Sequence, residues 1–150
     1  MKEVYFTTEK LVNESEKILE EIKCNNSVRK FDPEISNSVL LVLDMQEYFL
    51  DPASHAFVPS STAIINGINE LINAFRKKNL PVIFTKHINT NENAGLMKTQ
   101  WKDLITLRNP LSCIAPVINI ESSAVIVKSQ YDAFYHTDLN AFLRSSLCDT

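Results

Sequence analysis

Two charged side chains stand at the ends of apolar runs, where a carboxylate and an ammonium could do acid–base chemistry. Asp44 directly follows the apolar residues 39–43, and Lys128 directly follows residues 124–127. Partial burial raises the pKa of a carboxyl group and a nearby cation lowers it, which is the tuning that a general acid or base requires. If the two strands are neighbours, Lys128 could orient Asp44 and stabilise negative charge in a transition state. The alternative is that each charge only marks where a strand meets solvent.

Further side chains could line a pocket beside this pair. Gln46 is a hydrogen-bond donor close to Asp44 or, alternatively, orients the loop. His87 follows the second predicted strand, in the sequence FTKHINT, and either lines the pocket or is an ordinary loop residue. Aromatic side chains could form the wall of a pocket for a small ring, although aromatic residues at the ends of helices and strands more often only pack against neighbouring side chains. The candidate substrate-binding residues are Gln46, Phe49, His87, Trp101 and Tyr131.

The elements that must position these residues are short apolar runs and amphipathic helices. Residues 39–43 are an uninterrupted apolar run, the pattern of a parallel strand covered on both faces, and this strand is expected to be central. Residues 82–85 are a second short run rich in β-forming residues, and residues 124–127 are a third run expected to be buried. Helical spacing is predicted for the apolar positions of residues 11–22, 64–75 and 139–147, the last with Thr137 as its cap. A short helix is expected within residues 96–107.

This order of elements predicts an α/β fold, a three-layer α/β/α arrangement with a mostly parallel, Rossmann-like central sheet and an N-terminal amphipathic helix before it. Turn-forming residues within 24–38 separate that helix from the rest. In such sheets ligands bind beyond the carboxyl ends of the strands, where Asp44 and Lys128 are expected to lie.

Composition excludes several classes of function. The 150 residues include 45% apolar and 22% charged residues with a net charge of −3, so neither nucleic acid nor a membrane is an expected partner. No apolar run approaches the roughly 20 residues of a membrane helix, and a cytoplasmic location is predicted. Because only Gly67 and Gly95 occur, no P-loop or G-x-G-x-x-G turn can be written. No cofactor is expected, and three cysteines without C-x-x-C spacing suggest reduced thiols.

Two ordered motifs carry a resemblance to a known family. The sequence VLLVLDMQEYF at residues 39–49 resembles the first strand of isochorismatase-like (cysteine hydrolase) proteins, in which D-x-Q and an aromatic follow an apolar run. VIVKSQYDAFYHTDL at residues 125–139 is similar to their strand that ends in lysine. PVIFT lies between them at residues 81–85. The resemblance covers residues 38–150 and leaves 1–37 as an N-terminal helix and polar link.

The resemblance implies that Asp44 is the catalytic acid or base and Lys128 its charged partner. In the amide-cleaving branch a cysteine after the next strand is the nucleophile, whereas in the isochorismatase branch glycine can replace it and Asp protonates a vinyl ether. The matching motifs end before that position, so the domain is expected to be incomplete at its C-terminus. Cys148 precedes the expected strand and, like Cys24 and Cys113, is interpreted as an ordinary thiol.

The sequence near His87 is comparable to a D-x-H motif that nicotinamidase-type members of the family use to bind a metal. Thr85 and Lys86 stand where an acidic ligand would be needed, so no metal site is predicted. The expected partners are a small-molecule substrate and other copies of the chain in a homo-oligomer.

The leading hypothesis is a hydrolase acting on a vinyl ether or on an amide or carbamoyl C–N bond. The alternative is a non-catalytic or degenerate α/β binding domain that lacks the third catalytic position. A phosphoacceptor receiver domain is disfavoured, because it needs an additional acidic pair for magnesium and Asp44 is followed by Met and Gln.

Overall fold

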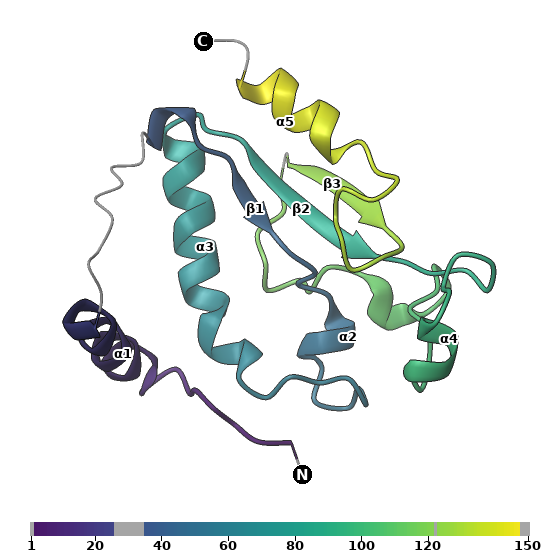
Figure 1. The fold of residues 1–150 in the computed structure, drawn as a ribbon, viewed down its shortest axis with the longest axis horizontal. Helices are drawn as coiled ribbons and strands as arrows, with labels where there is room; N and C mark the ends of the chain where they lie inside the picture. The colour runs from purple at the N-terminus through teal and green to yellow at the C-terminus, as the bar shows by residue number, and fades with distance from the viewer. Residues whose placement is uncertain (1, 26–34, 122, 148–150) are drawn as a thin grey trace.

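The computed structural model describes residues 2–25, 35–121 and 123–147, and Cys148 therefore lies outside the described part (Figure 1). The helices are α1 (Leu11–Asn25), α2 (Glu47–Leu50), α3 (Ser61–Lys77), α4 (Met97–Gln100) and α5 (Leu139–Leu147), with 3-10 turns η1 (Ile35–Asn37) and η2 (Pro110–Ser112). The strands are β1 (Leu40–Val42), β2 (Val82–His87) and β3 (Ala124–Lys128). The short helix expected within residues 96–107 is confirmed by α4.

The described strands form one parallel sheet in the order β1-β2-β3. Leu40 pairs with Val82, and Phe84 pairs with Val125. The predicted parallel sheet is confirmed. Among the described strands β1 lies at one edge and β2 lies between the other two, so the expected central position of β1 is not found in this part of the sheet. An uninterrupted apolar run indicates that both faces of a strand are covered, but it does not indicate whether the strand pairs with one neighbouring strand or with two.

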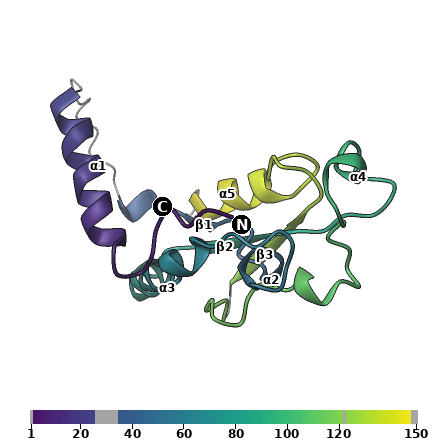
Figure 2. The same ribbon diagram turned by 90° about the horizontal axis from the view of Figure 1, so that it is seen from below.

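Helices lie on both sides of this sheet, which confirms the layered α/β architecture. Val42, Val82 and Phe84 form one buried cluster with Ile72 of α3. Helix α5 lies on the opposite side of the strands (Figure 2), and its first residue, Leu139, is fully buried. The Thr137 hydroxyl accepts a hydrogen bond from the Leu139 N–H at 3.3 Å, as its predicted capping role requires.

Several apolar residues expected to be covered are open to solvent. Ile64 and Leu71 share the predicted apolar stripe of α3, yet they are 41% and 50% exposed, because the stripe is wider than the surface that packs on the sheet. Val125 and Val127 of β3 are also exposed, whereas Lys128 at its end is buried. Val125 and Val127 lie on the same face of β3, and this face is open to solvent in the described part of the chain.

Helix α1 confirms the predicted N-terminal amphipathic helix and lies apart from the sheet (Figure 1). The segment before it is tied to the start of α3, because the N–H groups of Tyr5 and Phe6 both donate to Ser60 Oγ, at 2.9 and 3.0 Å. The ammonium of Lys2 donates to the Phe57 carbonyl. None of the helices described here combines the length and the apolar character that crossing a membrane would require.

Candidate active site

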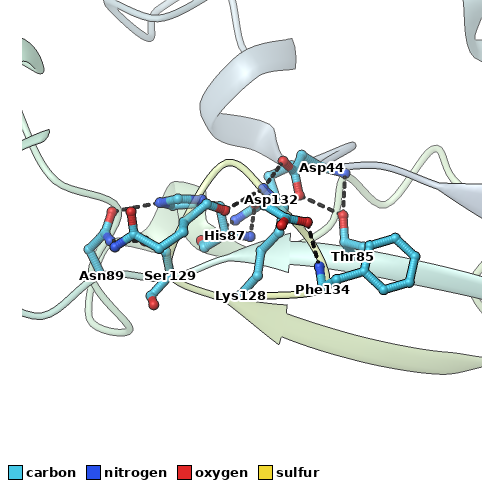
Figure 3. Close-up of polar contacts among 10 residues, drawn as sticks. Asp44, Thr85, His87, Asn89, Lys128, Ser129, Asp132 and Phe134 are labelled. Atoms are coloured by element: carbon cyan, nitrogen blue, oxygen red, sulfur yellow. Dashed lines mark hydrogen bonds and ion pairs between the residues drawn. The ribbon is translucent and has the colours of Figure 1, made fainter. Parts of the chain in front are cut away.

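Asp44 is held at the carboxyl end of the sheet by an uncommon backbone conformation. Its φ of 52° lies in the left-handed region, which Asp tolerates better than most residues and which costs other L-residues about 1–2 kcal/mol. The Asp44 N–H donates to Thr85 Oγ1 at 3.1 Å, and the Thr85 hydroxyl donates to Asp44 Oδ1 at 2.6 Å. These two bonds fix the carboxylate over the middle strand (Figure 3).

Lys128 completes an ion pair with this carboxylate. Its Nζ lies 2.7 Å from Asp44 Oδ2, with the lysine side chain 4% exposed and the aspartate side chain 27% exposed. The sequence-based condition for this pair, that the two strands be neighbours, is not met. The pair forms across β2, because Asp44 is drawn over the middle strand by Thr85 and the long lysine stem reaches it from β3. The Gln130 carbonyl accepts a second bond from Lys128 Nζ.

Gln46 holds the loop after Asp44 in place. Its side chain is fully buried, and its Oε1 accepts from the His87 N–H at 2.7 Å. Its Nε2 donates to the carbonyl oxygens of His87 and Ser112. All three bonds go to main-chain atoms, which favours the loop-orienting alternative for Gln46 over a contact with substrate.

His87 is the last residue of β2 rather than a residue after the strand, which corrects its expected position. The side chain is buried and its Nε2 lies 2.7 Å from Asn89 Oδ1. Because the Asn89 amide donates to the Ser129 carbonyl, its oxygen faces His87, and the proton of the neutral ring is assigned to Nε2. Burial lowers the pKa of His87, and the Lys128 charge adds to this, against the opposing effects of Asn89 and Asp44.

Trp101 joins the predicted aromatic residues into one cluster. Its ring centroid lies 5.3 Å from that of His87 and 6.2 Å from that of Tyr131, and its Nε1–H donates to the Tyr131 hydroxyl. Phe49 meets the same indole edge-on at 6.4 Å. The structure therefore brings His87, Trp101, Tyr131 and Phe49 together. Tyr131 remains 67% exposed, so this end of the cluster is open to solvent.

An open pocket of about 860 Å³ is lined in part by Trp101, and neither Asp44 nor Lys128 is among the described residues that line it. Its wall includes Tyr48, which stacks on the indole at 6.0 Å. Burial, and secondarily the charge of Asp103, raises the pKa of Tyr48 to about 12. The Tyr48 hydroxyl bonds the Asp103 carbonyl and lies 3.2 Å from His55 Nε2, so it serves mainly to fix this wall.

Thr85 and Asn89 belong to this network but were not among the site residues predicted from the sequence. One pattern in the sequence could have identified them. Thr85, His87 and Asn89 recur at every second position, the period that places side chains of an extended chain on one face. The face they share also carries Lys128, which pairs with His87 in the sheet register. No comparable pattern marks His55 and Asp103, which are far apart in the chain.

The described residues offer little to a metal ion. No three His, Cys, Asp or Glu side chains within residues 2–25, 35–121 and 123–147 are grouped so that they could hold one. At the positions compared above with the D-x-H of nicotinamidase-type proteins, the Thr85 hydroxyl is engaged with Asp44 and the His87 ring with Asn89. Of the described cysteines, Cys24 and Cys113 are both free thiols at the surface.

Parallel strands, helices on both faces and a carboxylate–ammonium pair at the strand ends define the class: an α/β domain with a hydrolase-type fold. The family model of the Isochorismatase domain matches residues 38–150, and the chain belongs to this family. The predicted resemblance to isochorismatase-like and cysteine hydrolase proteins is thereby confirmed. The family is generally hydrolytic.

Solved structures and a curated relative agree with this assignment. A cysteine hydrolase from Pseudomonas syringae pv. phaseolicola 1448A superposes with a TM-score of 0.75 at 22% identity, covering 82% of this chain and 61% of that one. Pyrazinamidase of Pyrococcus horikoshii, solved in complex with zinc, gives 0.62 at 25% identity, covering 71% and 63%. A protein of Arabidopsis thaliana described as a probable inactive nicotinamidase is 25% identical over an alignment of 127 residues, and the match covers 73% of this chain and 61% of that protein.

The chain thus spans about three fifths of the length of these relatives. The coverage is consistent with the expectation that the matched domain is partial.

Proposed function

We propose that this domain hydrolyses a small molecule, with Asp44 as the acid or base and Lys128 as its charged partner. The observation that carries the proposal is the 2.7 Å ion pair between a buried ammonium and a carboxylate that is 27% exposed. Removing a charged pair of this kind from water costs free energy, so the pair is not explained by a gain in stability. Its position at the carboxyl ends of parallel strands, where ligands bind in such sheets, supports a role in catalysis. Thr85 orients the same carboxylate, which leaves its exposed side toward solvent.

Two bond types suit this arrangement. For a vinyl ether, the protonated carboxyl group of Asp44 would give its proton to the double bond, and water would add at the ether carbon to release an alcohol and a carbonyl compound. For an amide or carbamoyl C–N bond, the Asp44 carboxylate would take the proton of an attacking thiol or water and return it to the leaving nitrogen. If the nucleophile is a thiol, water would then cleave the thioester and release the acid. Lys128 would hold the carboxylate in place in either reaction.

The residues around Trp101 are proposed to receive the substrate. His87 is kept neutral by burial and faces the indole, so it adds no second positive charge beside Lys128. The open Tyr131 end of the aromatic cluster provides an approach from solvent. Phe49 and Trp101 offer flat apolar surfaces for a small ring.

The experiment is turnover of a defined panel: isochorismate, nicotinamide, pyrazinamide and N-carbamoylsarcosine. Asp44→Asn keeps the shape and tolerates the left-handed backbone, so it should lower kcat by about 100-fold or more while the fold is kept. Glu70→Gln, a carboxylate change on the solvent side of α3, is the matched control and should leave kcat unchanged. Equal kcat for wild type and Asp44→Asn would refute the catalytic assignment.

A non-catalytic binding domain is the second candidate, because the Arabidopsis thaliana relative is described as inactive. Trp101 is the only tryptophan in the chain and lies within the proposed binding cluster, so its fluorescence reports ligand binding directly. A ligand of the panel that shifts this fluorescence but is never turned over by wild type would favour the binding domain.

Domain organisation and cellular setting belong to the same proposal. We propose that residues 38–150 are the hydrolase-type domain, that residues 1–37 are an arm with a separate role, and that the protein acts in the cytoplasm as a homo-oligomer. Two uncovered apolar helix faces, on α1 and α3, support the proposed oligomer.

A further inference from the structure

Two cavities of the protein share part of their walls. The open pocket of about 860 Å³ described above and a second one of about 420 Å³ are both lined by Tyr48, His55, Trp101 and Lys102. Both volumes lie in the range of about 300–1,000 Å³ that is usual for small-molecule sites. We call the two together the Trp101 cavity.

Lysine side chains gather around the Trp101 cavity. Lys98 of α4 lines the larger part, Lys2 lines the smaller part, and Lys102 lines both. All three lysines are exposed, and none forms an ion pair with another residue in the described part of the chain. Asp103 is the only acidic residue among the described residues of the wall. The wall therefore carries a net positive charge, although the chain as a whole carries −3.

The carboxylate of Asp103 is itself opposed by a histidine. The Tyr48 hydroxyl donates its one proton to the Asp103 carbonyl, so in its 3.2 Å contact with His55 Nε2 the histidine nitrogen is the donor. His55 Nδ1 lies 3.6 Å from Asp103 Oδ2. When the ring is protonated, it offsets the charge of Asp103, and the lysines are then the groups of the wall that lack a counter-ion.

Lys2 is brought to the cavity by the N-terminal arm. The N–H groups of Tyr5 and Phe6 donate to Ser60 Oγ, and Lys2 Nζ donates to the Phe57 carbonyl at 2.7 Å. An ammonium group has three N–H donors, so Lys2 can bond a ligand while it keeps this contact. The matched family domain begins at residue 38, so this cation comes from outside it.

Aromatic rings supply the apolar part of the wall. Phe49 and Trp101 line the smaller part of the cavity, and the Tyr48 ring stacks on the indole with an angle of 18° between the ring planes. Flat apolar groups pack well against such rings. A ligand that matches both the rings and the lysines has a flat apolar body and a negatively charged group.

We propose that the Trp101 cavity binds a small organic anion, with a carboxylate or phosphate group on a flat apolar body. Lys2, Lys98 and Lys102 bind the negative group, and the indole of Trp101 packs against the body. Lysine acts as a point charge and suits a carboxylate and a phosphate alike. The site goes beyond the proposed hydrolysis, because neither Asp44 nor Lys128 is among the described residues of its wall and binding requires no bond cleavage.

Isothermal titration calorimetry of the full chain with benzoate, phenylphosphonate and benzyl alcohol tests the charge requirement. These probes contain no vinyl ether, amide or carbamoyl bond, so the result does not depend on turnover. At least one of the two anions should bind at millimolar concentration, and uncharged benzyl alcohol should bind at least tenfold more weakly. The affinity for the anion should also fall as NaCl is raised to about 0.3 M, because salt screens exposed charges. Equal affinity for the anions and benzyl alcohol, or no binding of either anion at millimolar concentration, would overturn the proposal.

Lysine substitutions locate the bound anion. Lys102→Met should raise the dissociation constant about threefold and Lys98→Met with Lys102→Met about tenfold, since each exposed ion pair contributes little by itself. Lys2→Met tests the contribution of the arm and should raise the constant by a similar factor to Lys102→Met. Lys77→Met, at an exposed lysine of α3 outside the wall, is the matched control and should leave the constant unchanged.

Far-UV circular dichroism checks that every variant keeps its helices. If the double variant binds the anion as tightly as wild type does, or if Lys77→Met weakens binding equally, the anion does not bind in the Trp101 cavity and the proposal is wrong.

Discussion

Lys128 Nζ lies 2.7 Å from Asp44 Oδ2, although Asp44 follows β1, Lys128 ends β3 and β2 lies between these two strands. The lysine is almost completely buried and the aspartate is partly open. Thr85, on the intervening strand, holds the other carboxylate oxygen. The three side chains therefore form one unit across the full width of the described sheet, and removing any member leaves a neighbour without its partner.

Lys128→Met should destabilise the fold by about 3 kcal/mol, because the Asp44 carboxylate loses the cation that offsets its desolvation. Urea unfolding measures the free energy. The double variant with Asp44→Asn should lose at least about 1 kcal/mol less than the sum of the two single changes, since the pair interacts directly. Strict additivity would show that the two groups are not coupled in solution.

Gln46→Leu should cost about 3 kcal/mol, because the His87 N–H, the His87 carbonyl and the Ser112 carbonyl would lose buried partners together. Gln46→Glu keeps one acceptor but turns a carboxylate toward two carbonyls, so it should also destabilise. Gln130→Leu, a change of the same type at a site where the amide bonds a single exposed carbonyl, is the control. Similar losses at positions 46 and 130 would contradict the loop-orienting role.

Stability should fall as the pH drops below about 6.5, the ordinary pKa of histidine, with His87 as one source. Burial lowers the folded-state pKa of His87, so the unfolded chain binds a proton first and the native state loses free energy as the pH falls toward that lower value. Above 6.5 the ring is neutral in both states and contributes no pH dependence.

His87→Gln should therefore flatten the plot of unfolding free energy against pH between 7 and 5. His136→Gln, at a second histidine that is exposed, is the comparison. An unchanged slope in His87→Gln would show that His87 is not buried as a neutral ring.

Asn79 ends α3 in a left-handed conformation, with φ at 55°. The N–H groups of Asn79 and Leu80 donate to the carbonyls of Arg76 and Phe75, a pairing that closes helix ends and favours glycine. Asn79→Gly should therefore raise the unfolding free energy by up to about 0.5 kcal/mol, and Asn79→Val should lower it by about 1–2 kcal/mol. Thermal unfolding of both variants measures the difference. A valine variant more stable than the glycine variant would show that α3 does not end in a left-handed residue at position 79.

The sequence alone determined the class of fold and the two charged residues of interest. Uninterrupted apolar runs predict covered parallel strands, the spacing of residues 64–75 predicts α3, and two ordered motifs identify the family. These signals are local, because burial and helix period act on neighbouring residues.

Only the tertiary structure decided which strand is central, how Asp44 reaches Lys128 across β2 and what Gln46 binds. Strand order and the left-handed turn at Asp44 depend on contacts between residues about 40 to 85 positions apart, and no local pattern encodes them. The same holds for Leu71, whose apolar character predicts burial, while the width of the surface that covers α3 leaves it exposed.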